Sequence, residues 1–104
     1  MTQVAVIAKL TAAEGKAENL TAVIADLIAQ IRDGEPGTLV YAAAQDTADQ
    51  GVFWFYEFYD SADAATAHST GEALANAGNR MRGLLAGPPE VHRLLPVAGK
   101  GLPT

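Results

Sequence analysis

Hydrophobic and polar positions follow two different periodicities along the chain, and their succession predicts the order of the elements. Residues 4–10 form a short, partly β-branched and almost continuously apolar run, which is typical of a strand covered on both faces. Apolar residues then recur at intervals of three and four, at Leu20, Val23, Ile24, Leu27, Ile28 and Ile31. This spacing predicts an amphipathic helix that reaches about Arg32 and buries one face.

Local signals mark both ends of this predicted helix. Thr11-Ala12-Ala13-Glu14 has the S/T-x-x-E form of a capping box, so we expect the helix to begin at this point. Gly34 can adopt the left-handed conformation that ends helices, and Pro36 restricts the residue before it. The next strand is therefore expected from Thr38 to about Gln45.

A hairpin is predicted in the middle of the chain. Residues 46–51 are polar turn formers, and residues 52–59 are the segment richest in aromatic and β-branched residues. A turn centred at about residues 48–49 places Tyr41 opposite Tyr56. A register slip of one residue pairs Tyr41 with Glu57 instead and reverses the faces of the strand.

Two helical stretches and a last strand are expected in the second half. Asp60-Ser61 supplies N-cap chemistry for residues 62–69, and Thr70-Gly71 precedes a second stretch from Glu72 to about Leu85. These stretches form either one broken helix or two helices. Gly87-Pro88-Pro89 ends the region, and residues 90–95 can form a strand. We expect one domain over residues 1–97 and a flexible tail over residues 98–104.

The resulting order, β-α-β-β-α-β, predicts an α+β fold of the ferredoxin-like type. In this fold the helices cover one face of a four-stranded antiparallel sheet and leave the other face open in the monomer. Residues 52–59 are apolar at nearly every position, so both faces of the sheet need cover. A second copy of the chain is the simplest cover, which predicts a homodimer.

Composition narrows the classes of function. The chain has 104 residues, a net charge of -5 and no cluster of Lys or Arg, so nucleic acid and anionic membranes are not expected partners. The absence of cysteine removes disulfides, thiolate metal sites and a cysteine nucleophile, and suits a reducing cytosol. No apolar run is long enough to span a bilayer, so we expect a cytoplasmic protein. The phosphate-loop, dinucleotide and nucleophile-elbow motifs are absent, which disfavours nucleotide enzymes and hydrolases.

Histidine and glutamate are the candidate acid–base groups. His68 follows the Asp60-Ser61 helix start by about two turns and can point toward the sheet, where it could transfer protons. The alternative for His68 is a place on the helix surface or a capping role. Glu57 interrupts an aromatic strand and could act as a base in apolar surroundings. The competing interpretation of Glu57 is an ion pair with Arg80 or Arg82, or exposure at a dimer rim.

Aromatic and polar residues supply candidate substrate contacts. Tyr41, Trp54 and Tyr56 could hold a planar aromatic molecule, although strand aromatics often belong to the core. Asn76 and Arg80 are one helical turn apart and could orient a substrate carbonyl, unless they form a solvated surface. His92 lies far from His68 and has no carboxylate at ligand spacing, so we expect no metal.

Three segments resemble the antibiotic biosynthesis monooxygenase family: Glu35–Tyr41, Phe55–Asp60 and Ala67-His68-Ser69. The resemblance covers about residues 4–97. It implies a dimeric α+β barrel that oxidises quinols or aromatic polyketides with O2 and with neither metal nor flavin. By the same resemblance, His68 assists deprotonation of the substrate, and Tyr41, Trp54 and Tyr56 contact its ring.

Two other functions remain open from the sequence. The same barrel could be a non-catalytic dimer that binds a hydrophobic metabolite. A related branch of the family degrades haem and carries an Asn on the first strand, a Trp shortly after the third and a His on the next helix. Here residues 4–10 contain no Asn and Trp54 lies inside the third strand, so only His68 matches.

Overall fold

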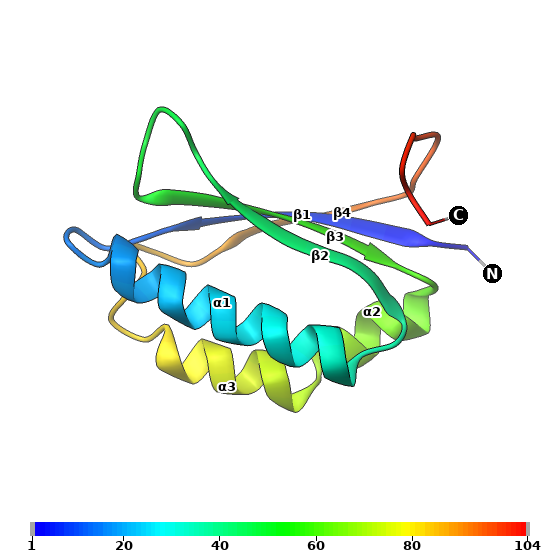
Figure 1. The fold of residues 1–104 in the computed structure, drawn as a ribbon, viewed down its shortest axis with the longest axis horizontal. Helices are drawn as coiled ribbons and strands as arrows, with labels where there is room; N and C mark the ends of the chain where they lie inside the picture. Colours follow the sequence, from blue (N-terminus) through cyan, green and yellow to red (C-terminus); the bar gives the residue numbers. More distant parts are fainter. Residues whose placement is uncertain (1, 104) are drawn as a thin grey trace.

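The computed structural model describes residues 2–103, which form a sheet with all three helices on one face (Figure 1). The elements are β1 (Val4–Thr11), α1 (Ala17–Gly34), β2 (Thr38–Gln45), β3 (Val52–Tyr59), α2 (Ala62–Ser69), α3 (Glu72–Arg80) and β4 (Glu90–Leu94). All strand pairs are antiparallel, and the order across the sheet is β2-β3-β1-β4. The predicted ferredoxin-like α+β fold is confirmed.

The main core lies between the sheet and α1. Alternate residues of β1 and β3 point toward the helices, because successive side chains of a strand face opposite sides. They pack against the buried face of α1, which consists of Leu20, Val23, Ile24, Leu27 and Ile31. These are five of the six positions that the three- and four-residue periodicity selects, and the sixth, Ile28, is partly buried against the same cluster.

The hairpin register differs from the alignment that places Tyr41 opposite Tyr56. Tyr41 pairs with Glu57, and Tyr56 pairs with Ala42. A register shift between Thr38 and Val40 accompanies this alignment. Because a shift of one residue reverses the faces of a strand, Tyr41 and Glu57 point toward the helices, whereas Tyr56 points away from them.

The predicted capping box at Thr11 is wrong. Thr11 is the last residue of β1, where it pairs with Val52, and its carbonyl accepts a hydrogen bond from the Ala86 amide. Its backbone is therefore committed to the sheet. The chain turns through Gly15, whose φ of 77° favours glycine, and α1 begins at Ala17 without a side-chain cap.

The second helical region consists of two helices. The Ser61 hydroxyl accepts a hydrogen bond from the Ala64 amide at 3.1 Å, as expected of an N-cap, and α2 ends at Ser69. The second helix, α3, is shorter than predicted because it ends at Arg80 rather than near Leu85. The chain then passes through turns in which Gly83 has a φ of 79°.

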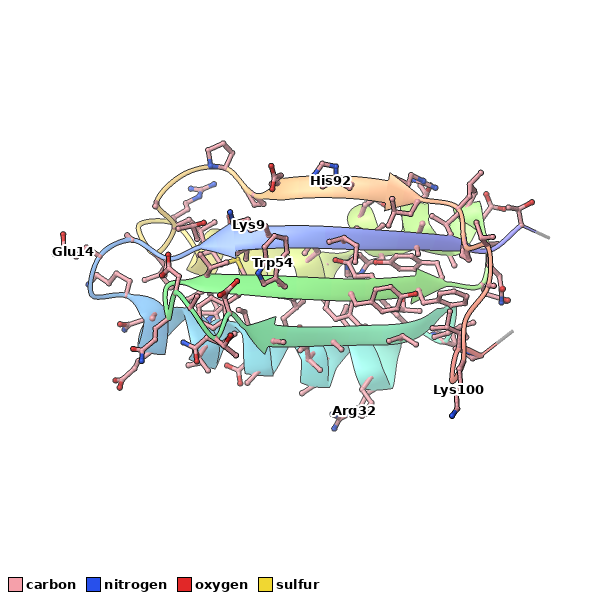
Figure 2. The ribbon with its side chains drawn as sticks, turned by 90° about the horizontal axis from the view of Figure 1, so that it is seen from above. Lys9, Glu14, Arg32, Trp54, His92 and Lys100 are labelled. Atoms are coloured by element: carbon pink, nitrogen blue, oxygen red, sulfur yellow. The ribbon has the colours of Figure 1, made fainter. Side chains whose placement is uncertain are left out.

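The other face of the sheet carries no helix. Figure 2 views this open face, with Lys9, Trp54 and His92 on it. The chain after β4 turns back across one end of the face (Figures 1 and 2), where the Gln3 side chain donates a hydrogen bond to the Pro103 carbonyl. Phe58 points to this face and is fully buried. Within residues 2–103, no helix has the length and apolar character needed to cross a membrane.

Candidate active site

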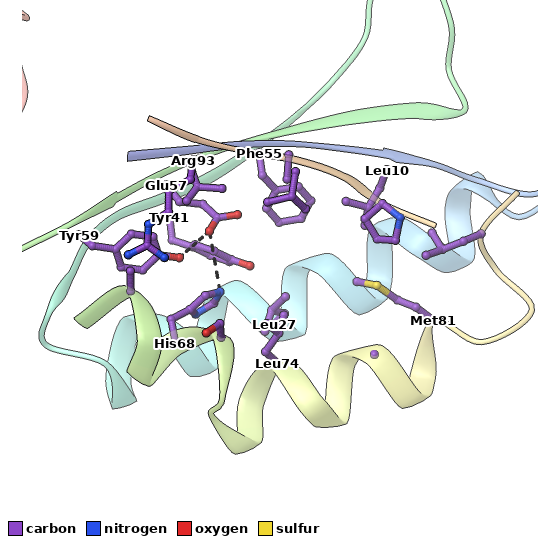
Figure 3. Close-up of a pocket in the computed structure, with 18 of the residues that line it drawn as sticks. Leu10, Leu27, Tyr41, Phe55, Glu57, Tyr59, His68, Leu74, Met81 and Arg93 are labelled. Carbon is purple, nitrogen blue, oxygen red and sulfur yellow. Dashed lines mark hydrogen bonds and ion pairs between the residues drawn. The ribbon is translucent and has the colours of Figure 1, made fainter. Parts of the chain in front are cut away.

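A cavity of about 640 Å³ lies between the sheet and the helices. Figure 3 shows it beneath β1 and β3, with α2 and α3 opposite. Most of its walls are apolar, and the side chains that contribute include Val6, Ala8, Leu10, Leu27, Phe55, Leu74 and Met81. Its polar groups gather near α2, where Figure 3 shows Arg93 of β4 close to Glu57. Arg82, which follows α3, also lines the cavity. Such a cavity suits a small, largely apolar molecule with a polar reacting end.

His68 projects from α2 into the polar end of the cavity and is only 4% exposed. Its Nδ1 lies 2.8 Å from Glu35 Oε1, and its Nε2 lies 3.9 Å from Glu57 Oε1. The first distance is a hydrogen bond and the second is too long for one. Because a carboxylate accepts, Nδ1 donates to Glu35, and Nε2 is the ring nitrogen on the side of Glu57.

Glu35 reaches His68 because the chain after α1 passes close to α2. The Glu35 amide donates to the Ile31 carbonyl and closes the helix end. A Cβ on Gly37 would lie 2.7 Å from Ala64 Cβ, so only glycine allows this approach. The Thr38 hydroxyl also donates to Glu35 Oε1, at 2.9 Å, which fixes the carboxylate beside the imidazole.

Glu57 and Tyr59 are two residues apart on β3, and both side chains point toward the cavity. The Tyr59 hydroxyl donates to Glu57 Oε1 at 2.5 Å. Burial raises the pKa of Glu57, and this rise is opposed by the Tyr59 hydrogen bond and by His68. Burial, with the adjacent Glu57, also raises the pKa of Tyr59, so the phenol stays protonated and keeps donating.

Tyr41 completes the enclosure of the imidazole. Its ring centre lies 4.8 Å from that of His68 and 5.6 Å from that of Phe55, while the Tyr59 ring centre lies 5.5 Å from His68. Burial raises the pKa of Tyr41, with smaller contributions from Glu57 and Glu35. Its hydroxyl therefore remains a neutral hydrogen-bond donor for a ligand at this end of the cavity.

Together these groups can remove a proton from a bound hydroxyl. The Nε2 atom of His68 could accept this proton, and Glu35 is placed to orient the ring, as a carboxylate does beside a catalytic histidine. The apolar walls exclude water from the anion that forms. The arrangement places a histidine with a carboxylate partner at the polar end of a largely apolar cavity.

Comparison with known proteins identifies the family. The sequence pattern of the antibiotic biosynthesis monooxygenase family matches residues 3–80. The chain belongs to this family. No curated protein matches the sequence.

Solved structures agree with the family assignment. A candidate antibiotic biosynthesis monooxygenase from Caulobacter crescentus CB15 is 32% identical, with a TM-score of 0.88 over 93% of this chain and 92% of that chain. PA3566 from Pseudomonas aeruginosa is 30% identical, with a TM-score of 0.85 over 94% and 97% of the two chains. A candidate family member from Chloroflexus aurantiacus is 29% identical, with a TM-score of 0.81 over 97% and 99%.

Two of the aromatic residues selected from the sequence lie away from this cavity. Trp54 and Tyr56 project from the open face of the sheet. The Trp54 Nε1 donates to Asp46 Oδ2 at 2.9 Å, and the Lys9 ammonium lies 5.4 Å from the indole centre. Of the three aromatics proposed as substrate contacts, only Tyr41 lines the cavity with His68.

The polar candidates on α3 are also separated from His68. Asn76 lines a second groove, which Glu35 also lines, and does not line the main cavity. Arg80 forms an exposed ion pair with Asp26 of α1 at 2.8 Å, so the expected pairing of Arg80 with Glu57 is wrong. Within residues 2–103 no arginine forms an ion pair with Glu57, which uses Tyr59 and His68 instead.

Glu35 and Tyr59 are the site residues that sequence reasoning missed. Glu35 belongs to the first segment of the family resemblance, but its partner His68 is 33 residues away and no local pattern links them. Tyr59 follows Glu57 by two residues on the same face of β3. The strand period could have indicated that the two side chains are neighbours.

The site does not fit the haem-degrading branch. A porphyrin whose iron is bound by the histidine nitrogen is a wide, flat ring, and it needs open space on all sides of the iron–nitrogen bond. The Glu57 carboxylate lies 3.9 Å from Nε2, within the space that such a ring would need. Among residues 2–103, no group of three or more His, Cys, Asp or Glu side chains is arranged to hold a metal ion.

Proposed function

We propose that this protein is a cofactor-independent monooxygenase for a small aromatic or quinol substrate. The observation that carries the proposal is His68, which is bonded through Nδ1 to Glu35 and presents Nε2 to an apolar cavity. Membership of the antibiotic biosynthesis monooxygenase family supports the same reaction class. The substrate binds with a hydroxyl at Nε2 and its ring among the apolar walls.

The reaction balances with the substrate as the only reductant. His68 takes a proton from the substrate hydroxyl, and the resulting anion gives electrons to O2 to form a carbon–oxygen bond. The peroxide oxygens then separate. One oxygen atom stays in the product, and the other leaves as water with the two hydrogens removed from the substrate, so that SH2 and O2 give SO and H2O.

Each polar group at the closed end has a separate task in this proposal. His68 Nε2 moves the proton, and Glu35 orients the ring. Tyr41 donates a hydrogen bond to the oxygen anion of the substrate, since its raised pKa keeps it protonated. The buried Glu57 accepts a hydrogen bond from the Tyr59 hydroxyl, and this bond keeps the Glu57 carboxylate beside His68.

Isotope labelling tests this reaction directly. The purified, metal-free protein is incubated under ¹⁸O2 with simple and naphthalene-based hydroquinones, and the masses of the products are measured by mass spectrometry. We expect one ¹⁸O atom in each product and the other in water. Hydrogen peroxide with an unlabelled quinone would instead identify an oxidase, and ligand binding without O2 uptake would identify a binding protein.

We further propose that the protein works as a homodimer in the cytoplasm. The open face of the sheet carries Trp54, which is 38% exposed, together with half-buried Ile7 and Tyr56. A second copy would cover these side chains and shield β3 on both faces. The absence of cysteine is compatible with the reducing cytosol.

A further inference from the structure

Glu35 separates two hollows in the molecule. His68 lines the main cavity, and Glu35 lines a second groove of about 690 Å³ between the end of α1, the start of β2 and the junction of α2 with α3. The bond from His68 Nδ1 to Glu35 Oε1 therefore crosses the wall between the two hollows. It is the kind of contact through which a proton can pass without a channel for water.

The two carboxylate oxygens of Glu35 have different surroundings. Oε1 accepts from His68 and from Thr38, at 2.8 and 2.9 Å. Oε2 makes no hydrogen bond to any residue from 2 to 103 and lies near Gly71, which lines the second groove. The Glu35 side chain is 17% exposed, against 5% for His68. Because the terminal torsion of glutamate has a broad profile, the carboxyl group can turn and exchange its oxygens.

We propose that Glu35 is a proton conduit that exchanges the Nδ1 proton of His68 with water in the second groove. This inference rests on the proposed function, in which a bound substrate fills the main cavity and blocks His68 Nε2 from solvent. When Nε2 takes the substrate proton, Nδ1 passes its own proton to Glu35, which releases it to the groove. A proton returns by the same route when the peroxide is protonated, so the net balance is unchanged.

The other titratable groups near His68 do not offer this route. Arg93 lines the main cavity from β4, but a guanidinium only donates hydrogen bonds and cannot accept one. Glu57 and Tyr59 face the main cavity from β3, and Tyr41 faces it from β2. Glu57 Oε1 is 3.9 Å from Nε2 and is bonded to Tyr59. All three would be covered by the same substrate that covers Nε2. Among residues 2–103, only Glu35 is hydrogen-bonded to Nδ1, and Glu35 lines the second groove rather than the main cavity.

Solvent exchange of the His68 Nδ1 proton tests the conduit without any substrate. The exchange rate is measured by NMR on ¹⁵N-labelled protein, for wild type, Glu35→Gln and Glu72→Gln. Glutamine has the same shape as glutamate and its amide oxygen can accept the hydrogen bond from His68 Nδ1, but it cannot take up the Nδ1 proton. We expect exchange about 10²-fold slower in Glu35→Gln, the lower end of what a general base contributes. Glu72 lines the same groove without bonding to His68, so Glu72→Gln should match wild type.

Chemical rescue of a Glu35 variant is a second test of the conduit. Formate added to Glu35→Ala should restore fast Nδ1 exchange and, with an oxidisable hydroquinone, should raise kcat with little change in KM. An unchanged exchange rate in Glu35→Gln, or equal slowing in Glu72→Gln, would overturn the conduit even if the enzyme turns over. Slow exchange in Glu35→Gln with no O2 uptake by wild type would uphold the conduit and reject the proposed reaction.

Discussion

His68 lies between two carboxylates whose surroundings differ. Glu35 is partly exposed, is fixed by Thr38 and contacts Nδ1 at hydrogen-bond distance. Glu57 is buried, accepts from Tyr59 and stays 3.9 Å from Nε2. The first arrangement fixes the tautomer of the imidazole, and the second leaves Nε2 accessible to a substrate hydroxyl. This asymmetry is the basis for proposing Nε2 as the base.

Replacing Glu57 with glutamine should change the pH dependence of stability. Burial raises the pKa of Glu57 in the folded protein, so its charged form opposes folding. Its contribution is most favourable below the unfolded pKa and is lost as pH rises through the folded pKa. We therefore expect Tm of Glu57→Gln minus Tm of wild type to increase between pH 4 and pH 7.

Thermal unfolding over that pH range provides the measurement. The exposed Glu14 offers a matched control, because Glu14→Gln removes one carboxylate from the surface of the same chain. A difference in Tm for Glu57→Gln that falls with rising pH would show that the folded protein favours the charged carboxylate at this position. That result would contradict a raised pKa for Glu57.

At the scale of elements, the site depends on how α2 meets the end of α1. The Ser61 cap fixes the start of α2, and His68 follows two turns later on its buried side. Glu35 arrives from the chain between α1 and β2, which crosses α2 at Gly37. A small change in this crossing would separate Glu35 from His68 while leaving every element intact.

Gly37→Ala tests the importance of that crossing. Its Cβ would lie 2.7 Å from Ala64 Cβ, so the loop or α2 must shift. We expect a loss of about 1–3 kcal/mol in the free energy of unfolding, typical of overpacking. Denaturant unfolding measures this loss, and kcat should fall with it as Glu35 moves.

Gly34→Ala is the matched control for this substitution. Nothing lies within 4 Å of a Cβ added at Gly34, which is the last residue of α1. The same chemical change should therefore be neutral or stabilise by up to about 1 kcal/mol. Equal destabilisation by both substitutions would show that the contact with Ala64 is not the cause.

The sequence was sufficient to predict elements with strong periodicity and insufficient to predict contacts between them. The α1 face, the aromatic strand β3 and the Ser61 cap are local patterns, and the structure confirms them. The Thr11 capping box failed because strand pairing used the same backbone groups. The Tyr41 register stayed open because residues 46–51 allow more than one turn. His68 was selected as a base, but Glu35 depends on a tertiary approach that no local pattern encodes.

The whole molecule is a two-layer structure with an incomplete outer face. Helices cover the cavity side of the sheet (Figure 1), whereas Trp54 lies on the side that carries no helix (Figure 2). Tyr56 lies on the same side, because it is two residues from Trp54 on β3. Tyr56 lies near the middle of this open face, between Ile7 of β1 and Ala42 of β2. A charge at this position would have to be buried by any second copy that covers the face.

Tyr56→Asp should therefore convert the proposed dimer into a monomer. An uncompensated carboxylate in an apolar interface costs several kcal/mol, which corresponds to at least about 10²-fold weaker association. Light scattering coupled to size exclusion measures the mass directly. Asn19→Asp adds the same charge on the exposed side of α1 and should leave the mass unchanged. A monomeric wild type, or a Tyr56→Asp protein that stays dimeric, would contradict the proposed use of this face.

The central claim is that His68 is the base of a cofactor-free oxygenation, and O2 consumption tests it most directly. Uptake is measured for the metal-free protein with a panel of small hydroquinones and polyphenols, beside His68→Ala and the matched variant His92→Ala. His92 lies exposed on the opposite face of the sheet. We predict uptake that falls about 10²- to 10⁴-fold in His68→Ala and is unchanged in His92→Ala. Uptake independent of His68, or none with any substrate of the panel, would contradict this role of His68.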